Sequence, residues 1–362
     1  MKTRSTLLGL LMALTLLTVF CLSALASAQD NDSTQEKAVP RYDVLYRPVD
    51  PNMPKPDVSL QEWNGHFTYN STQYNFVMVG ADPATNQGAL IPTIIIPLKI
   101  VLSDGSVWDP LAGGPFGALA RTLQSPIFDK STDYTQGGVD LGHTQYIDAF
   151  QRGNFWSIVQ NNPNSHLLLG GPTSGITVLP EQTLNVPAGS GHVGSPFGHQ
   201  VAEVGYGYLD GQIRTIMSQM QQIQPNTFPI FMTYNTYLTS GGCCIGGYHG
   251  NVGAQTYSHF TYIGYVGDFA QDVSALSHEV GEWADDPLYP TRNNTPCGIL
   301  EVGDPLEGTN NYGGYPYTLH GFTYNLQDLV FLRYFGADPS TSVNDWWSFQ
   351  NYPFTRICQN GS

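Results

Sequence analysis

The sequence predicts an α+β fold, in which a mixed β-sheet and a few helices are joined by many loops and tied by two disulfides. Segments of strand length and apolar character occur beside segments with helical periodicity, which favours a mixture of both element types. The 362 residues include 39 Gly and 25 Pro and only 12% charged residues, a composition typical of loop-rich exported proteins. Four of the five Cys lie beyond the N-terminal segment, and an even number favours two disulfides in an exported chain.

Strands are expected where apolar and β-branched residues run between turn residues. The expected strands are residues 66–79 (a hairpin turning at Asn70-Ser71-Thr72), 91–102, 175–179, 227–237 and 260–266. Helices are expected at 146–159, 211–223, 269–285 and 324–335, because apolar side chains there recur on one face. The Gly- and Pro-containing residues 187–207 are expected to form a loop.

The N-terminus has the three parts of a signal peptide. Lys2 and Arg4 precede an apolar run over residues 7–24, and Ala26-Ser27-Ala28 supplies a cleavage pattern. We therefore expect a signal peptide at 1–28 and a secreted protein, extracellular or periplasmic, that is free of the membrane after cleavage. The alternative is a retained membrane anchor, because the apolar run is nearly long enough to span a bilayer.

The charge and composition of the remaining chain limit its partners. Cleavage after Ala28 removes two of the 14 basic residues and no acidic one, so the net charge falls from −15 to −17. Such a surface repels nucleic acid and anionic lipid. We expect a disordered linker at 29–45, a β-rich N-terminal lobe at 46–225 and a C-terminal lobe at 226–362.

The cysteines set an expectation about which segments meet. Adjacent Cys243 and Cys244 can pair with each other only through a strained ring, so each is expected to reach Cys297 or Cys358. Both remaining connectivities tie the 243–249 loop to the segment around residue 297. A catalytic cysteine is not expected, because no thiol is left over.

The stretch from Ala275 to Pro287 carries the most informative polar residues. On a helix, His278 and Glu282 stack one turn apart at spacing i, i+4, and Asp285 falls on the same side. Leu276, Val280 and Trp283 gather on the opposite side. Such a helix packs its apolar stripe on a core and presents an imidazole and a carboxylate that can point at one ion. The plainer alternative is a solvated polar face of an amphipathic helix.

This stretch resembles the H-E-x-x-H helix of the zinc metallopeptidases, the zincins. The resemblance makes His278 the first Zn²⁺ ligand and Glu279 the general base. Glu282 stands where the second His would be, and carboxylates bind zinc at about 2.0–2.2 Å. By the same resemblance, Glu301 is the first choice for third ligand, and Asp304 is its neighbour that orients a ligand or is itself the ligand.

A second resemblance involves four motifs in order. They are Cys244-Ile-Gly-Gly-Tyr-His249-Gly, Ser277-His-Glu-Val-Gly-Glu282 with Asp286-Pro287, Glu301-Val-Gly-Asp304, and Tyr324-Asn325. The set resembles the secreted phosphate-induced (EXORDIUM-like) proteins over roughly residues 225 to 335. Gly281 replaces that family's usual Ala. A bond from Cys243 or Cys244 to Cys297 is expected to bring His249 near His278, as a ligand or an oxyanion donor.

These observations lead to one preferred function and two alternatives. The preferred one is a secreted, zinc-dependent, peptidase-like hydrolase that acts on a peptide or protein. The first alternative is a non-catalytic EXORDIUM-like cell-surface protein with a structural or vestigial metal site, and a closed coordination shell would distinguish it. The second is a carbohydrate-binding module, which rests only on the 12% aromatic content.

Overall fold

The computed structural model describes residues 41–45, 59–171, 175–288, 293–309 and 313–359. All of them belong to one unit, Ala38–Ser362. The predicted signal peptide and residues 29–40 of the predicted linker lie outside the described residues. Within that predicted linker, Arg41–Leu45 instead forms strand β1, which pairs in parallel with β15 (Cys243–Val252).

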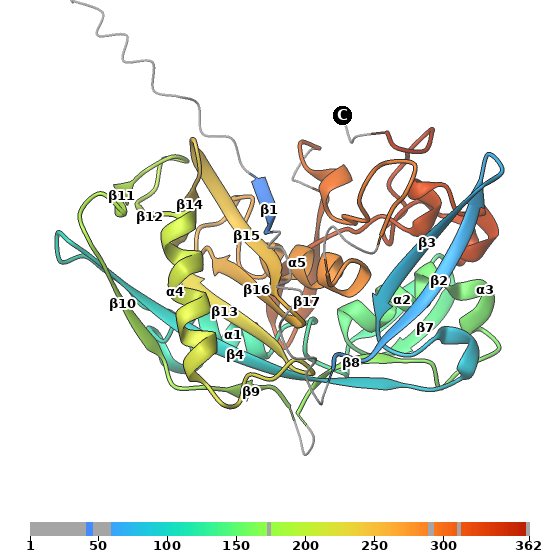
Figure 1. Cartoon of the computed structure of the whole chain (residues 1–362), viewed down its shortest axis with the longest axis horizontal. Helices are drawn as coiled ribbons and strands as arrows, with labels where there is room; N and C mark the ends of the chain where they lie inside the picture. Colours follow the sequence, from blue (N-terminus) through green and yellow to red (C-terminus); the bar gives the residue numbers. More distant parts are fainter. Residues whose placement is uncertain (1–40, 46–58, 172–174, 289–292, 310–312, 360–362) are drawn as a thin grey trace, which may run out of the picture. The chain divides into compact units, whose positions relative to one another are not determined.

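Among the described residues, twelve strands form one mixed sheet, which confirms the predicted α+β class (Figure 1). Its main path runs in the order β10 (Gln182–Val186), β4 (Ala89–Leu102), β13 (Phe228–Tyr234), β16 (Gln255–Tyr262), β15, β14 (Thr236–Thr239), β12 (Val201–Gly205) and β11 (Gly191–Gly194). Off this path, β1 pairs with β15, and β5 (Val107–Trp108), β8 (Leu167–Gly170) and β9 (Thr177–Val178) pair with β4.

The long strand β4 joins the two predicted lobes. Its beginning pairs with β8, its middle with β13 and its end with β10. Strands from both sides of the expected boundary at 225/226 therefore share one sheet.

Side chains of β4 alternate between two apolar clusters, as a strand buried on both faces requires. Ile94, Ile96 and Leu98 belong to one cluster, together with the apolar face of α4 (Tyr206–Gln219). Ile91 and Ile95 belong to the other cluster, which also contains the apolar residues of α5 (Ser274–Asp285). The two helices thus contribute to different cores.

The remaining elements are short. Hairpins form between β2 (Glu62–Tyr69) and β3 (Thr72–Val79), β6 (Asp133–Gln136) and β7 (Val139–His143), and β17 (Gly314–Leu319) and β18 (Phe322–Gln327). The other helices are α1 (Ala118–Leu123), α2 (Tyr146–Asn154) and α3 (Trp156–Val159). The first hairpin confirms the predicted turn, since Asn70 and Ser71 both have positive φ.

Two predicted elements are wrong. Residues 324–335 do not form a helix, because Tyr324 and Leu326 alternate inward along β18, and only a 3₁₀ turn, Leu332–Phe335, follows. Residues 187–207 are not a plain loop, because they contain β11, β12 and the start of α4. Strand β12 pairs in parallel with β14 and buries Val201, Ala202 and Val204 despite its Gly-rich surroundings.

The predicted disulfide connectivity is also wrong. Cys297 bonds to Cys358 with a Cα–Cα distance of 5.2 Å, while Cys243 and Cys244 lie beside each other at the start of β15. Two contacts of the Tyr334 carbonyl oxygen explain the pairing: it accepts from the backbone N of Cys358 at 3.1 Å and lies 3.7 Å from Cys297 Sγ. One carbonyl therefore contacts both cysteines.

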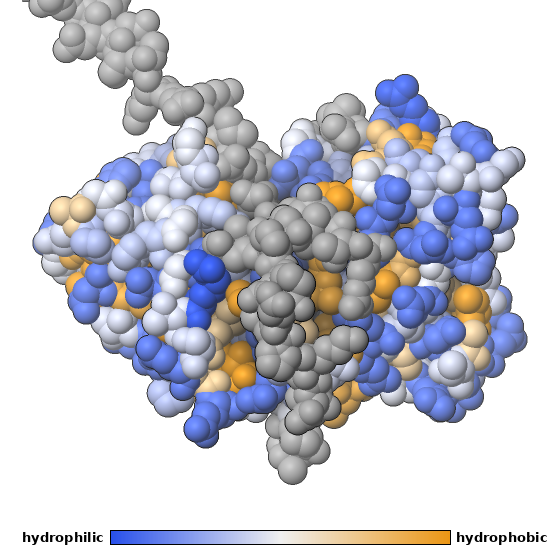
Figure 2. Space-filling model, viewed as in Figure 1, coloured by the Kyte–Doolittle hydropathy of each residue, from blue (hydrophilic) through white to orange (hydrophobic). Residues whose placement is uncertain are grey.

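No helix in the described part of the chain has the length and apolar character needed to cross a membrane. On the face shown in Figure 2, hydrophobic residues are scattered among hydrophilic ones. The exposed large hydrophobic residues are Leu90, Val107, Leu111, Phe116, Val178 and Val266.

Candidate metal centre

Helix α5 positions the polar residues that the sequence singles out. It begins at Ser274, later than predicted, because Asp272 takes a left-handed backbone conformation with φ of 45°. All twelve residues of α5 are buried, including His278, Glu279 and Glu282. A solvated polar face is therefore excluded: the polar stripe of this helix lies inside the protein.

The first group of side chains surrounds His278. Its Nδ1 lies 2.8 Å from Gln327 Oε1, and Gln327 Nε2 donates to the carbonyl of Gly303 at 3.0 Å. Because the amide nitrogen of Gln327 is used as that donor, its oxygen must accept, and His278 Nδ1 carries the proton. The lone pair of Nε2 then faces Glu282 Oε1 at 3.0 Å and Asp304 Oδ1 at 3.7 Å.

The second group surrounds His249 on β15. Its Nδ1 lies 3.4 Å from Glu279 Oε2 and 3.6 Å from Glu282 Oε2, and its Nε2 lies 3.9 Å from Glu301 Oε1. His249 reaches this position because β15 pairs antiparallel with β16 and α5 packs on both strands. The expected meeting of His249 with α5 thus occurs, but through sheet pairing and not through a disulfide.

Two sets of three side chains could each hold a metal ion, and they share Glu282. One set is His249, Glu282 and Glu301; the other is His278, Glu282 and Asp304. In both sets the candidate ligand atoms lie within 4.8 Å of one another. All six predicted site residues thus come together, with Asp304 beside His278 and Glu301 beside His249.

Burial makes this cluster electrostatically costly. Burial is the main reason that the pKa of Glu282 and that of Glu301 lie well above the usual range, and each is raised further by neighbouring carboxylates. Burial lowers the pKa of His278, and burial with the nearby His278 lowers that of His249 to about 3. Both rings are therefore neutral at neutral pH, the form that binds metals. A divalent cation is the compensation that this donor set fits, since an uncompensated buried charge costs several kcal/mol.

Two glycines let the backbone approach these side chains closely. A Cβ on Gly303 would lie 2.4 Å from His278 Nδ1, and a Cβ on Gly247 would lie 2.7 Å from Glu279 Oε1. Real Cβ atoms do not approach so closely, so any side chain at either position displaces part of the cluster.

The cluster borders a pocket of about 460 Å³. Residues lining it include Cys297, Glu301, Asp304, Glu307, Tyr334 and Phe335. The side chain of Asp304 is 49% exposed, whereas those of His278 and Glu282 are buried. One side of the cluster is therefore reachable from outside through Asp304.

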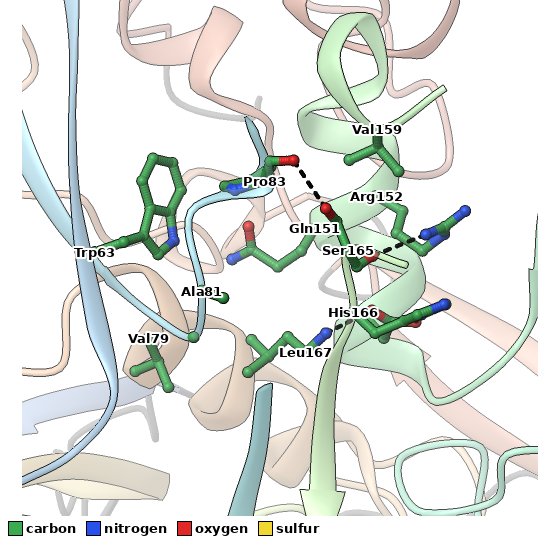
Figure 3. A pocket seen from close by; sticks show the side chains of 12 residues that line it. Trp63, Val79, Ala81, Pro83, Gln151, Arg152, Val159, Ser165, His166 and Leu167 are labelled. Atoms are coloured by element: carbon green, nitrogen blue, oxygen red, sulfur yellow. Dashed lines mark hydrogen bonds and ion pairs between the residues drawn. The ribbon is translucent and has the colours of Figure 1, made fainter. Parts of the chain in front are cut away.

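A smaller pocket, of about 30 Å³, lies between the loop after β3 and helix α2 (Figure 3). The buried Asp148 at this pocket accepts hydrogen bonds from Thr144 Oγ1 and the backbone N of Leu167, and pairs with His166 Nδ1 at 2.8 Å. These polar groups satisfy one another, so we interpret this second pocket as structural.

Sequence reasoning missed Gln327, which fixes the proton of His278. The alternation of Tyr324 and Leu326 with polar neighbours was the available signal for a strand that carries it. Comparison with protein-family models, curated proteins and solved structures gives no match for this chain. The function must therefore be argued from the cluster itself.

Proposed function

We propose that this chain is an exported, metal-dependent, peptidase-like hydrolase with Zn²⁺ as its ion. The observation that supports it best is the buried His278 Nε2, whose lone pair faces Glu282 Oε1 at 3.0 Å. Two acceptor atoms at that distance repel unless a cation or a proton lies between them. The resemblance of the helix to that of the zincins favours zinc and peptide-bond hydrolysis.

In this proposal His278, Glu282 and Asp304 hold the ion. When bound, Zn²⁺ would polarise a carbonyl and lower the pKa of its water to about 7. Gln327 holds the imidazole of His278 in the tautomer that a metal requires, an arrangement typical of metal-binding histidines.

Glu279 acts as general base in this proposal. It follows His278 directly on α5, and its Oε2 lies 3.4 Å from His249 Nδ1. Glu279 takes the proton of the attacking water and passes it to the leaving amine. The oxyanion role considered for His249 is disfavoured, because its Nδ1 faces the carboxylates of Glu279 and Glu282 and not a substrate oxygen.

The non-catalytic alternative predicts a closed metal site. The half-exposed Asp304 and the adjoining pocket favour an open site, as catalysis needs. The Cys297–Cys358 disulfide supports export to an oxidising compartment, and a peptide or protein substrate fits that location.

The test compares Glu279→Gln with the wild type, both loaded with Zn²⁺. We expect Glu279→Gln to keep the metal and to lose about 10²–10⁴-fold in the hydrolysis rate of a fluorogenic peptide mixture. Glu203→Gln, on strand β12, is the control and should retain both metal and activity. Activity that survives in Glu279→Gln removes the assigned base, and a metal-loaded but inactive wild type favours the non-catalytic alternative.

A further inference from the structure

We propose that the cluster holds two divalent cations, with the carboxylate of Glu282 bridging them. The first position is the one in the proposed function, at His278, Glu282 and Asp304, and the inference rests on that function's metal site. The second position is His249, Glu282 and Glu301, a set that the proposed function does not use.

The two oxygens of Glu282 face different histidines. Oε1 lies 3.0 Å from His278 Nε2 and accepts from the backbone N of Gly303 and of Asp304 at 3.2 Å each. Oε2 lies on the side of His249, 3.6 Å from its ring. Glu282 belongs to both sets of candidate ligands, whose atoms lie within 4.8 Å of one another in each set, so its carboxylate can bridge two ions, which in two-metal enzymes lie about 3.5–4 Å apart.

The second position repeats the logic of the first. His249 Nδ1 has a hydrogen-bond partner in Glu279 Oε2, 3.4 Å away, so the proton of a neutral ring belongs on Nδ1 and is donated to Glu279. The lone pair of Nε2 is then directed toward Glu301 Oε1, 3.9 Å away.

Both atoms of that second pair are buried and lack a hydrogen-bond partner in the described part of the chain. The first ion shares only one ligand, Glu282, with the second set, so it does not contact His249 Nε2 or Glu301 Oε1. A second cation between Nε2 and Oε1 satisfies both atoms, and without it each bears the full cost of desolvation.

The donor atoms of both positions fit a divalent ion. Each position offers one nitrogen and carboxylate oxygens, a donor set suited to Zn²⁺ and Mn²⁺.

The experiment measures how many ions bind. Metal-free full-length protein is titrated calorimetrically with Zn²⁺ and with Mn²⁺, then desalted and analysed for metal content. We expect two equivalents in the wild type and one in Glu301→Gln and in Asp304→Asn, since each of these removes a ligand of one position. Glu203→Gln is the control and should keep two.

The outcomes separate the two proposals. One equivalent in the wild type, with a proton between Glu282 and Glu301, overturns the second ion and leaves the hydrolase proposal standing. No bound metal overturns both. If the variants fail to fold, Mn²⁺ resonance on the wild type decides: two equivalents should give a spin-coupled signal, and two uncoupled ions contradict the Glu282 bridge.

Discussion

Gln327 offers the sharpest test of the metal centre, because it touches His278 without being a ligand candidate. Replacing it by Leu keeps the side-chain size and removes both hydrogen bonds, the one to His278 Nδ1 at 2.8 Å and the one to the Gly303 carbonyl at 3.0 Å. The backbone N of Gln327 keeps its bond to Ser277 Oγ, so the position of β18 is preserved.

The expected effect follows because Leu no longer holds the proton of His278 on Nδ1. Removing the partner of a metal-binding histidine typically lowers metal affinity 10–100-fold, or about 1.4–2.7 kcal/mol. Leaving the Gly303 carbonyl and the Nδ1–H of His278 buried without partners should also lower the free energy of unfolding by about 1–3 kcal/mol for each group. Gln327→Glu retains the acceptor and should therefore keep most of the affinity.

Chelator competition with Zn²⁺ measures the affinity, and urea unfolding of the metal-free protein measures stability. Gln145→Leu is a matched control, because Gln145 is also buried. Its side-chain amide forms hydrogen bonds with backbone groups of Phe128 and Leu169 and with none of the cluster residues. This variant should lose stability but no metal affinity. If Gln327→Leu folds and binds Zn²⁺ within twofold of the wild type, the tautomer argument is refuted.

Two further predictions concern stability. Replacing Cys297 and Cys358 by Ala removes a disulfide between residues 61 positions apart. The free energy of unfolding, measured with urea, should fall by about 4 kcal/mol, and a decrease below about 1 kcal/mol contradicts this prediction. Burial raises the pKa of Asp272 to about 6, so the folded state keeps this proton longer than the unfolded state. The free energy of unfolding should therefore fall by about 3 kcal/mol from this group as pH rises from about 4 to 7, and equal pH slopes for Asp272→Asn and the wild type would be evidence against it.

The sequence could predict the helix and the cluster because local spacing determines both. His278 and Glu282 at i, i+4 must share a face on any helix, and the acidic residues downstream are visible as a pair. Glu301 lies beside His249 and Asp304 beside His278, and this division depends on the path of residues 300–306 past the two histidines. No local pattern encodes that path.

The errors have the same origin. The pairing of Cys297 with Cys358 depends on the fold, which brings both beside the carbonyl of Tyr334, a residue that the sequence gives no reason to single out. Gly281, a departure from the Ala of the EXORDIUM-like motif, is explained only by packing, since a Cβ there would lie 2.3 Å from Leu329 Cδ1. Tertiary contacts also place Tyr324 to Gln327, the start of an expected helix, in strand β18.

Strand β1 has a consequence for the main chain that carries His249. Val44 lies opposite His249 in a parallel register, so residues 245–250 of β15 have a neighbour on each side over much of their length. Removal of the chain up to Leu45 would leave the backbone amide and carbonyl groups on this edge of β15 unpaired, next to the cluster. An exposed strand edge is a template for pairing with another extended polypeptide, so β1 protects this edge of β15 from strand addition.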